Sequence, residues 1–392
     1  MAKAPFSPAE YQRRLGLTRA AMEAAGIELL FVTDPSNMAW LTGYDGWSFY
    51  VHQGVVLGLG GDPLWWGRRM DAFGALRTVW MAPDCVAPYD EGYVMSTERH
   101  PMEDLAGHLR DRAPSTARIG VEMENYYYSA RAHQLLADAL GAERLVDATG
   151  LVNRQRTVKS AEELVFMRKA AAISSAISTL AVERAEPGLA KNELVAEITA
   201  AAYRGVGEDW GDYPAIVPML PSGPDASAAH LTWNGDRLKS GEATFFELSG
   251  CYRRYHAPLC RSVYLGTPPD EITRSADALV EGVTAGIDAA RPGNRACDIA
   301  AALNGALAKA GIERKARAGY PVGLSYPPDW GERTISIRPE DESVLEPGMT
   351  FHFMPGLWAD DWGIEITETI LIREEGPAEP LCSVPRKLFV KP

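Results

Sequence analysis

One glutamate stands inside a stretch that otherwise reads as an apolar strand. Glu247 lies in the run Phe-Phe-Glu-Leu at residues 245–248. Burying a carboxylate is costly unless it meets a positive charge, which a cationic substrate or a nearby arginine would supply. Glu247 is therefore a candidate nucleophile or water-activating base. The alternative is a structural ion pair with Arg253, Arg254 or Arg261.

Two histidines near this strand are candidate site residues, and the first of them is a candidate for proton transfer. His230 follows Ser-Ala-Ala in a predicted loop, and an imidazole can protonate a departing nitrogen near neutral pH. A lone histidine is, however, more often structural. His256, within residues 254–258, either orients a substrate or packs beneath the strand, and the sequence favours neither.

Further candidates lie in the last third of the chain. Glu365 and Glu368 are three apart on a predicted strand, so they point to opposite faces, and we predict that Glu365 faces the site. Tyr320 and Trp330 are expected as walls of a binding site or as core residues that need a hydrogen-bond partner. Arg333 is a candidate partner for a substrate carboxylate.

Aromatic side chains gather in a glycine-punctuated loop at residues 43–53, which contains Tyr44, Trp47 and Tyr50. Aromatic faces attract cations, and loops on a scaffold often carry binding sites. The loop therefore indicates substrate binding. The alternative is a loop that covers the core or contacts a second subunit.

The elements that position these residues form two groups. In the first, helix and strand patterns alternate, which predicts an α/β domain over residues 1–155. Its elements are expected at 8–25 (helix), 29–33, 55–59 and 119–122 (strands) and 130–140 (helix). Periodicity lapses between residues 147 and 160, the predicted linker. Ser160 and Glu163 then form a capping box that opens a long helix.

The second group mixes helices with mostly antiparallel strands and predicts an α+β domain over residues 156–392. Helices are expected at 160–184, 191–205, 270–289 and 295–310. Strands are expected at 215–219, 243–250, 260–265, near 350 and at 364–372.

Composition excludes several classes of function. The 392 residues carry a formal charge of −13 with no Lys/Arg-rich run, which argues against nucleic-acid and anionic-membrane binding. The N-terminus lacks an apolar signal region, and no stretch approaches the roughly 20 apolar residues of a membrane span. We therefore expect a cytoplasmic protein. Five scattered cysteines without a CxxC pair argue against a disulfide framework or zinc knuckle.

Four segments resemble the pita-bread superfamily of methionine aminopeptidase, prolidase, aminopeptidase P and creatinase. They occur in the family's order and span most of residues 155–375: RTVKSAEELVFMRKAA, FFELSGCYRRYHAPLCRSVYLG, LEPGMTFHFMP and GIEITETILI. The resemblance implies a creatinase-like α/β N-terminal domain followed by an α+β pita-bread catalytic domain.

In the metallopeptidases of this superfamily, two aspartates, a histidine and two glutamates hold two metal ions. The matching positions here are Glu247, Pro258, Tyr320, Met354 and Thr367. Only one carboxylate remains, and Pro and Met side chains offer no hard oxygen ligands. The resemblance therefore implies an enzyme without metal or other cofactor. The alternative is a rearranged metal site that uses His352, Glu365 and Glu368.

Creatinase is a metal-free member whose catalytic histidine lies 17 residues before the first ligand position. That spacing leads to His230, which the resemblance thus marks as catalytic beside Glu247. The substrate-binding glutamate of creatinase corresponds to Cys260, so creatine itself is not supported as the substrate.

Longer strings resemble the ectoine hydrolases of the same superfamily: GYDGWSFYVHQ at 43–53, FFELSGC at 245–251, RYHAPLCRS at 254–262 and GLSYPPDWGERT at 323–334. The resemblance implies opening of the cyclic amidine of ectoine, and of hydroxyectoine, to N-acetyl-2,4-diaminobutyrate. It also implies a homodimer whose N-terminal loops approach the partner's site, and a downstream deacetylase linked in function or by contact.

Other readings stay open. One is an enzyme like dimethylsulfoniopropionate lyase or creatinase that acts on another small zwitterion. Another is a non-catalytic pita-bread binding module. The sequence also leaves open whether Glu247 forms a covalent intermediate or activates water, which ring bond breaks first, and whether the assembly is a dimer or tetramer.

Overall fold

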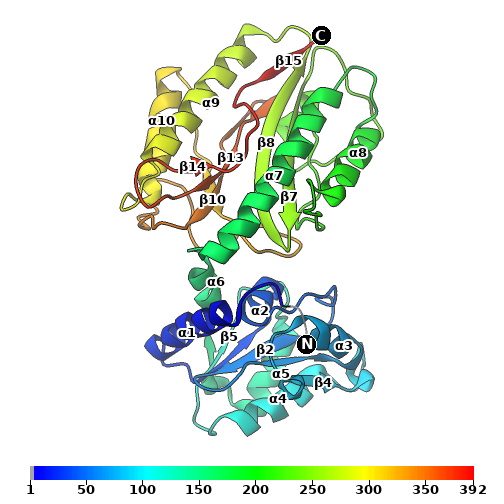
Figure 1. Ribbon diagram of the computed structural model, residues 1–392, viewed down its shortest axis with the longest axis vertical. Coiled ribbons are helices and arrows are strands. Elements are labelled where there is room, and N and C mark those ends of the chain that lie inside the picture. The colour runs from blue at the N-terminus through cyan, green and yellow to red at the C-terminus, as the bar shows by residue number, and fades with distance from the viewer. Residues whose placement is uncertain (1–3) are drawn as a thin grey trace. The chain divides into compact units, whose positions relative to one another are not determined.

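The computed structural model describes residues 4–392. The chain divides into two compact units, Met1–Arg156 and Thr157–Pro392, and each is described by itself (Figure 1).

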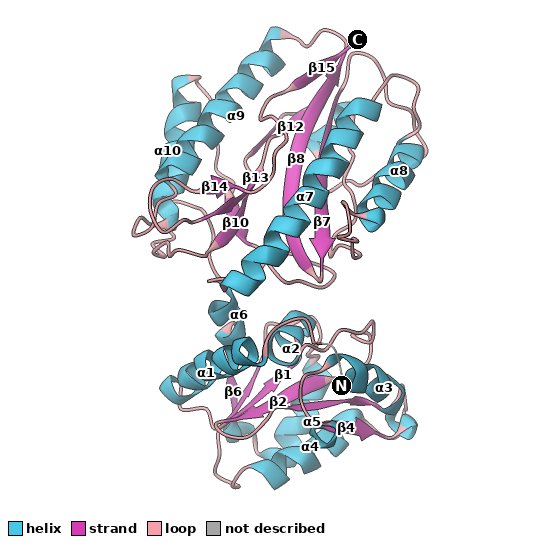
Figure 2. Cartoon of the chain, viewed as in Figure 1, coloured by secondary structure: helices cyan, strands magenta, loops and turns pink. Residues whose placement is uncertain are grey.

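The first unit is a six-stranded mixed sheet with helices on both faces (Figure 2). The strand order is β4-β3-β2-β1-β5-β6, with β1 antiparallel to β2 and parallel to β5. The strands are β1 (Leu29–Val32), β2 (Gly54–Gly58), β3 (Leu64–Arg68), β4 (Val86–Tyr89), β5 (Ile119–Val121) and β6 (Leu145–Asp147). The helices are α1 (Pro8–Ala24), α2 (Pro35–Thr42), α3 (Arg69–Thr78), α4 (Pro101–Arg112), α5 (Ala130–Leu140) and α6 (Leu151–Arg156).

The alternation of side chains along β1 divides the core of this unit in two. Leu30 and Val32 join the cluster that receives α1, α2, α3 and α6. Leu29 and Phe31 join the cluster that receives α4 and α5. Because successive residues of a strand face opposite sides, an unbroken apolar run is what a sheet covered on both faces requires. The predicted α/β domain is therefore confirmed.

The predicted linker at 147–160 is wrong over part of its length, because residues 151–156 form the packed helix α6. Val152 is buried in the core, while Asn153 and Arg156 are buried through hydrogen bonds to Asn37. Because these buried positions carry polar residues, the apolar periodicity of the sequence does not reveal the helix. Satisfied hydrogen bonds are what let such groups lie inside.

The second unit holds a long hairpin, two smaller sheets and four long helices. The strands are β7 (Ala243–Tyr252), β8 (Tyr255–Leu265), β9 (Gly319–Pro321), β10 (Thr350–Phe353), β11 (Gly356–Trp358), β12 (Gly363–Glu365), β13 (Glu368–Leu371), β14 (Glu379–Pro380) and β15 (Phe389–Lys391). The helices are α7 (Ala161–Arg184), α8 (Lys191–Arg204), α9 (Asp270–Ala289) and α10 (Ala296–Lys309). The sheet orders are β15-β8-β7, β14-β13-β10-β9 and β11-β12. This is the predicted α+β architecture.

The hairpin of β7 and β8 turns at Arg253 and Arg254, which have φ angles of 47° and 67°. Positive φ at both central residues suits the twist of a two-residue hairpin turn. Residues 215–219 were expected as a strand, and that expectation is wrong. Within that stretch only Met219 pairs, through a single bridge to Glu247.

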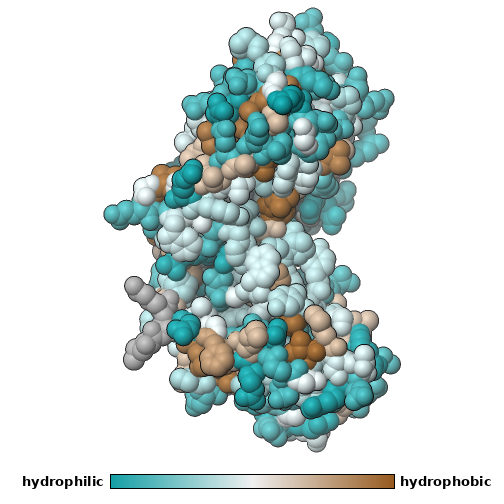
Figure 3. Space-filling view, turned by 90° about the vertical axis from the view of Figure 1, so that its right-hand side faces the viewer, coloured by the Kyte–Doolittle hydropathy of each residue, from teal (hydrophilic) through white to brown (hydrophobic). Residues whose placement is uncertain are grey.

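Helix α7 corrects the expectation that no segment is long and apolar enough for a membrane span. By length and composition alone it passes that test, with half of the apolar window buried. Its residues Ile173 and Ile177 lie in the core cluster that also contains Leu248 and Leu259 of the hairpin. This packing is typical of the core helix of a soluble protein. The face drawn in Figure 3 is mostly hydrophilic, with apolar side chains in scattered patches.

Candidate active site

The hairpin gives Glu247 its position. Residues directly opposite in an antiparallel pair share one face, and Glu247 lies opposite Cys260. On the other face, Leu248 and Leu259 pack in the core with α7. Glu247 therefore lies on the face turned away from α7. Its backbone also exchanges two hydrogen bonds with Met219, at 3.1 and 3.2 Å.

Glu247 is 7% exposed, and burial raises the pKa of its carboxyl group to about 7. An acid held near neutrality can change its charge in the range where enzymes work. The structure does not show the alternative, an ion pair between Glu247 and Arg261. Nη2 of Arg261 lies 2.7 Å from Oε1 of Glu368 instead, and both side chains are buried.

A second carboxyl group, that of Glu365, lies on the same face of the hairpin as Glu247. It hydrogen-bonds to the side chain of Cys260, the residue opposite Glu247. The Ser262 hydroxyl fixes the Glu365 backbone, accepting from its N–H at 2.8 Å and donating to its carbonyl at 2.9 Å. Burial, and then the charge of Glu247, raise the pKa of Glu365 well above its ordinary value. Two neighbouring carboxyl groups that resist double ionisation can serve as an acid and a base.

His352 on β10 joins the remaining polar groups. Its Nδ1 lies 3.3 Å from the hydroxyl of Tyr320 and 4.0 Å from a carboxylate oxygen of Glu247. Its Nε2 lies 3.0 Å from the hydroxyl of Thr367. That hydroxyl also accepts from the backbone N–H of Cys260 at 2.7 Å. Burial lowers the pKa of His352 to about 3, so the ring is neutral at pH 7.

Trp330 completes this cluster, since its Nε1–H donates to the Tyr320 hydroxyl at 2.9 Å. Both aromatic residues are buried, with Tyr320 8% and Trp330 0% exposed. The loop that carries Trp330 is held by a buried ion pair in which Nζ of Lys159 lies 2.7 Å from Oε2 of Glu332. The predicted residues Tyr320 and Trp330 are therefore brought together with Glu247, through His352.

The residues present do not fit the pair of metal ions that the fold family implies. Of the five matched positions, Tyr320 and Thr367 hold the His352 ring through their hydroxyls. Pro258 offers only a carbonyl, which accepts from Thr369 at 2.7 Å. Across residues 4–392, no group of three His, Cys, Asp or Glu side chains is placed to hold a metal ion. The donor set lacks the carboxylates that hard divalent cations prefer.

The two predicted histidines have different surroundings. His256 is fully buried, its Nε2 accepts from the backbone N–H of Ala215 at 2.8 Å, and burial lowers its pKa to about 3. His230 is exposed in the loop after the short helix η4 (Gly223–Ser227), and no contact joins it to Glu247 in the described structure. The same loop is anchored nearby, because the Thr232 carbonyl accepts from the N–H of Leu220.

Arg333 lies in the loop of Trp330 with a φ angle of 56°, and its side chain is about one-third exposed. Its Nε is 3.6 Å from Oδ2 of Asp329. This contact is longer than a hydrogen bond. Arg333 thus stands at the edge of the cluster that contains Tyr320 and Trp330, rather than inside it.

The aromatic loop of the first unit contains both buried and exposed side chains. Tyr44, one of the residues predicted to bind substrate, is buried in the core of the first unit. It is 3% exposed, its hydroxyl lies 2.5 Å from that of Ser48, and its ring lies 5.2 Å from that of Trp65 in the core. Trp47 and Tyr50 are 59% and 61% exposed. Only these two of the three predicted residues are available for binding.

His352 was predicted only as a ligand of the alternative metal site, yet it lies at the centre of the cluster. The one available signal was a histidine within the apolar run Thr-Phe-His-Phe at 350–353. A polar ring buried in such a strand needs partners for both nitrogens, which is itself an indication of a polar cluster.

Comparisons with known proteins agree with this architecture. Residues 165–374 match metallopeptidase family M24, and residues 14–158 match the creatinase/prolidase N-terminal domain. The chain is 55% identical to the ectoine hydrolase of Halomonas elongata, over 99% of this chain and 98% of that one.

Two solved structures share the whole fold. The dipeptidase PepE from Mycobacterium ulcerans has a TM-score of 0.81 at 27% identity and covers 98% of this chain and 99% of its own. The prolidase from Thermococcus sibiricus has a TM-score of 0.83 at 18% identity, over 97% and 99% of the two chains. This chain therefore belongs to metallopeptidase family M24, with a creatinase/prolidase N-terminal domain, and is a hydrolase that acts on carbon–nitrogen bonds.

Proposed function

We propose that this chain hydrolyses the cyclic amidine of ectoine to N-acetyl-2,4-diaminobutyrate, and does so without a metal ion. The observation that carries the proposal is the pair of buried carboxyl groups, Glu247 and Glu365, at a site whose family metal positions lack the required ligands. The name and 55% identity of the Halomonas elongata relative support ectoine as the substrate.

The two carboxyl groups divide the acid and base roles. Glu247 ionises first, with a pKa of about 7, and its charge then holds the proton on Glu365. Near neutral pH the site therefore contains one carboxylate and one carboxylic acid. Pairs whose pKa values are driven apart in this way perform acid and base chemistry at the same pH.

The reaction follows from this pairing. Glu247 either attacks the amidinium carbon or takes a proton from the water that attacks it. A new carbon–oxygen bond forms, and Glu365 donates its proton to the ring nitrogen whose bond to that carbon breaks. The carbon stays attached to the other nitrogen as an acetyl group. One water is consumed: it is the attacking group when Glu247 acts as a base, and it displaces Glu247 from the carbon when Glu247 is the nucleophile. Proton exchange with solvent then leaves Glu247 again a carboxylate and Glu365 again a carboxylic acid.

The cationic amidinium also explains why Glu247 can be buried. An ionised carboxylate inside a protein needs a counter-charge, and the ring of the substrate supplies one. Tyr320 and Trp330, linked by their hydrogen bond, form a rigid aromatic wall beside it. Arg333 at the edge of this cluster is the proposed partner of the substrate carboxylate, and His256 holds the backbone at Ala215.

His230 is proposed to carry protons between solvent and the buried carboxyl groups. It is exposed, yet its loop is tied to Leu220, the residue after the bridge partner of Glu247. Imidazole is suited to this transfer, since it gains and loses protons near neutral pH.

The same proposal extends to the range of substrates, the assembly of the enzyme and the fate of the product. We infer that hydroxyectoine is also a substrate, that the enzyme is a cytoplasmic homodimer, and that a deacetylase consumes the product, with or without direct contact. The exposed Trp47 and Tyr50 support an approach of this loop to a second copy. Size-exclusion chromatography with light scattering measures the assembly, and its loss in a Trp47→Ala variant would support this contact.

The test is ring opening followed by NMR of the ectoine ring protons. Enzyme treated with a chelator and dialysed should turn over ectoine at an undiminished rate. Glu247→Gln should lower the rate by about 10³-fold or more, because it removes the nucleophile or base. Glu242→Gln, a change of the same kind just before β7, is the matched control and should stay active. Loss of activity on chelation with rescue by a divalent ion would contradict the metal-free site.

A further inference from the structure

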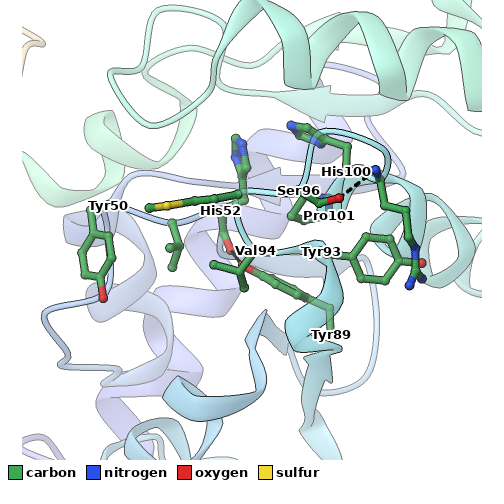
Figure 4. A pocket seen from close by; sticks show the side chains of 11 residues that line it. Tyr50, His52, Tyr89, Tyr93, Val94, Ser96, His100 and Pro101 are labelled. Atoms are coloured by element: carbon green, nitrogen blue, oxygen red, sulfur yellow. Dashed lines mark hydrogen bonds between the residues drawn. The ribbon is translucent and has the colours of Figure 1, made fainter.

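The first unit contains a cavity of about 170 Å³ with two histidines in its wall (Figure 4). Its lining comes from the segment before β2, the end of β4, the loop that follows, and the start of α4. The lining residues are Tyr50, Val51, His52, Tyr89, Tyr93, Val94, Met95, Ser96, Arg99, His100 and Pro101. None of the mechanism proposed above uses this cavity.

The two imidazoles lie together, with ring centroids 4.7 Å apart and an angle of 53° between the planes. His100 caps α4, because its Nδ1 accepts from the backbone N–H of Met102 at 3.2 Å. The neutral ring must then carry its proton on Nε2, which leaves that N–H as a donor. Coordination of a metal at Nε2 would break the cap, so the arrangement favours an acceptor ligand over a metal ion.

His52 is available to a ligand. In the described structure its ring makes no hydrogen bond, while its backbone carbonyl accepts from the buried Tyr89 hydroxyl at 2.8 Å. The backbone of His52 is thus fixed while its ring nitrogens remain open. A partly buried polar ring without a protein partner is typical of a group that meets a ligand or water.

The charges around the cavity are positive. Arg99 lines it, with its guanidinium 3.8 Å above the ring of Tyr93, and the charge of Arg131 acts on His100. Among the lining residues that the structure describes none is acidic. The carboxylate of Glu103 accepts from the backbone N–H of His100 at 3.0 Å. In a chain of net charge −13 such a region selects anions.

The rim of the cavity is apolar and aromatic. Met95 is 82% and Tyr50 61% exposed, and Met95 has a φ angle of 52°. Figure 4 shows Tyr50 and Tyr93 at opposite ends, with His52 and His100 between them. At about 30 Å³ for each water, the volume has room for a ligand of a few heavy atoms to one ring.

We propose that this cavity is a second ligand site, which binds a small organic monocarboxylate between His52, His100 and Arg99. The carboxylate accepts from the two imidazole N–H groups and faces the guanidinium, and the apolar body of the ligand lies against Tyr50 and Met95. Carboxylates paired with several charged or ring N–H donors form the stronger class of hydrogen bonds.

Binding should be linked to protons. Burial and the neighbouring His100 lower the pKa of His52 to about 4, and burial lowers that of His100. The groups facing the pair are Arg99 and Arg131, the hydroxyls of the lining tyrosines, and Glu103. A bound anion favours the protonated imidazole, so the affinity should be about threefold higher at pH 6 than at pH 8.

Isothermal titration of the full-length protein with sodium benzoate tests the site, with inorganic phosphate as the comparison anion. Saturable binding of benzoate is expected, at least tenfold weaker in His52→Phe and in Arg99→Gln. His108→Phe, which changes another histidine of the same unit, is the matched control and should bind normally. Ectoine hydrolysis should be unchanged in all three variants, so this site and the proposed function fail separately.

A second measurement does not depend on variants. In the wild-type protein, benzoate should raise the pKa of His52, as followed by the NMR signals of its ring, and leave His108 unmoved. Absence of saturable binding, or equal shifts at His108, would overturn the site. Phosphate binding as tight as that of benzoate would overturn the carboxylate assignment.

Discussion

Nδ1 of His352 lies 4.0 Å from a carboxylate oxygen of Glu247, although the two residues belong to different sheets. The ring is neutral, so it leaves the charge of that carboxylate uncancelled. The orientation of the ring is fixed at both nitrogens, by Tyr320 and Thr367. The polar surroundings of Glu247 therefore depend on the hydroxyl groups of these two residues.

Removing the hydroxyl of Tyr320 should show this dependence. Tyr320→Phe leaves the aromatic wall but deletes the bonds to Trp330 and His352. We expect kcat to fall about fivefold with little change in KM, since one hydrogen bond contributes roughly 1 kcal/mol. The control is Tyr264→Phe on β8, which removes a hydroxyl that donates to the carbonyl of Gly241. Equal losses in both variants would indicate a general effect on folding.

The pH dependence of ectoine hydrolysis should report the two carboxyl groups. Glu247 must be ionised, and burial places its pKa at about 7. Below that value kcat/KM should therefore fall about tenfold for each pH unit. Glu365 must be protonated, and its raised pKa keeps the proton at neutral pH, so the decline on the alkaline side begins above 7. A profile that is flat from pH 5 to 8 would contradict these roles.

Glu365 and Glu368 offer a comparison within one strand region. Glu365→Gln removes the proposed acid and should lower kcat by about 10²-fold or more while the fold stays intact. Glu368→Gln breaks the buried pair with Arg261, which also weakens the contact with Arg386. It should cost about 3 kcal/mol of folding free energy, while the protein that remains folded keeps its kcat. Thermal unfolding beside steady-state kinetics separates the two outcomes.

Much of this fold could be predicted, because long apolar patterns specify β1, α7 and the hairpin of β7 and β8. The capping box of Ser160 and Glu163 marks the start of α7 and is present in the structure. The prediction of short elements failed where polar side chains are buried through hydrogen bonds, as with Asn153 and Arg156 in α6. Such burial depends on partners far along the chain, which periodicity does not reveal.

The site shows the same limit. The place of Glu247 in a strand could be predicted, since a lone carboxylate among apolar residues stands out. The place of His352 in the cluster could not be predicted, because its partners Tyr320 and Thr367 are 32 and 15 residues away. The single strand predicted at 364–372 is wrong, because the chain breaks after Glu365 and places Glu365 on β12 and Glu368 on β13, in different sheets. Exposure of His230 depends on a loop whose path no pattern specifies.

His230 can be tested by rescue. His230→Ala removes the proposed proton carrier and should lower kcat at least tenfold in dilute buffer. Added imidazole should restore part of the rate, because a free base can carry the same protons. His133→Ala, which changes a histidine of the first unit bonded to the Tyr128 hydroxyl, should show neither effect. A variant of His230 with normal kcat in dilute buffer would remove it from the mechanism.

The hydroxyl of Thr367 stands where its relatives place a metal-binding carboxylate, and it holds the His352 ring and the backbone of Cys260 instead. Under the metal-free mechanism proposed above, such a centre would be complete as soon as the chain has folded. In a cell starved of zinc or manganese, turnover would then continue, because no ion would have to be loaded first.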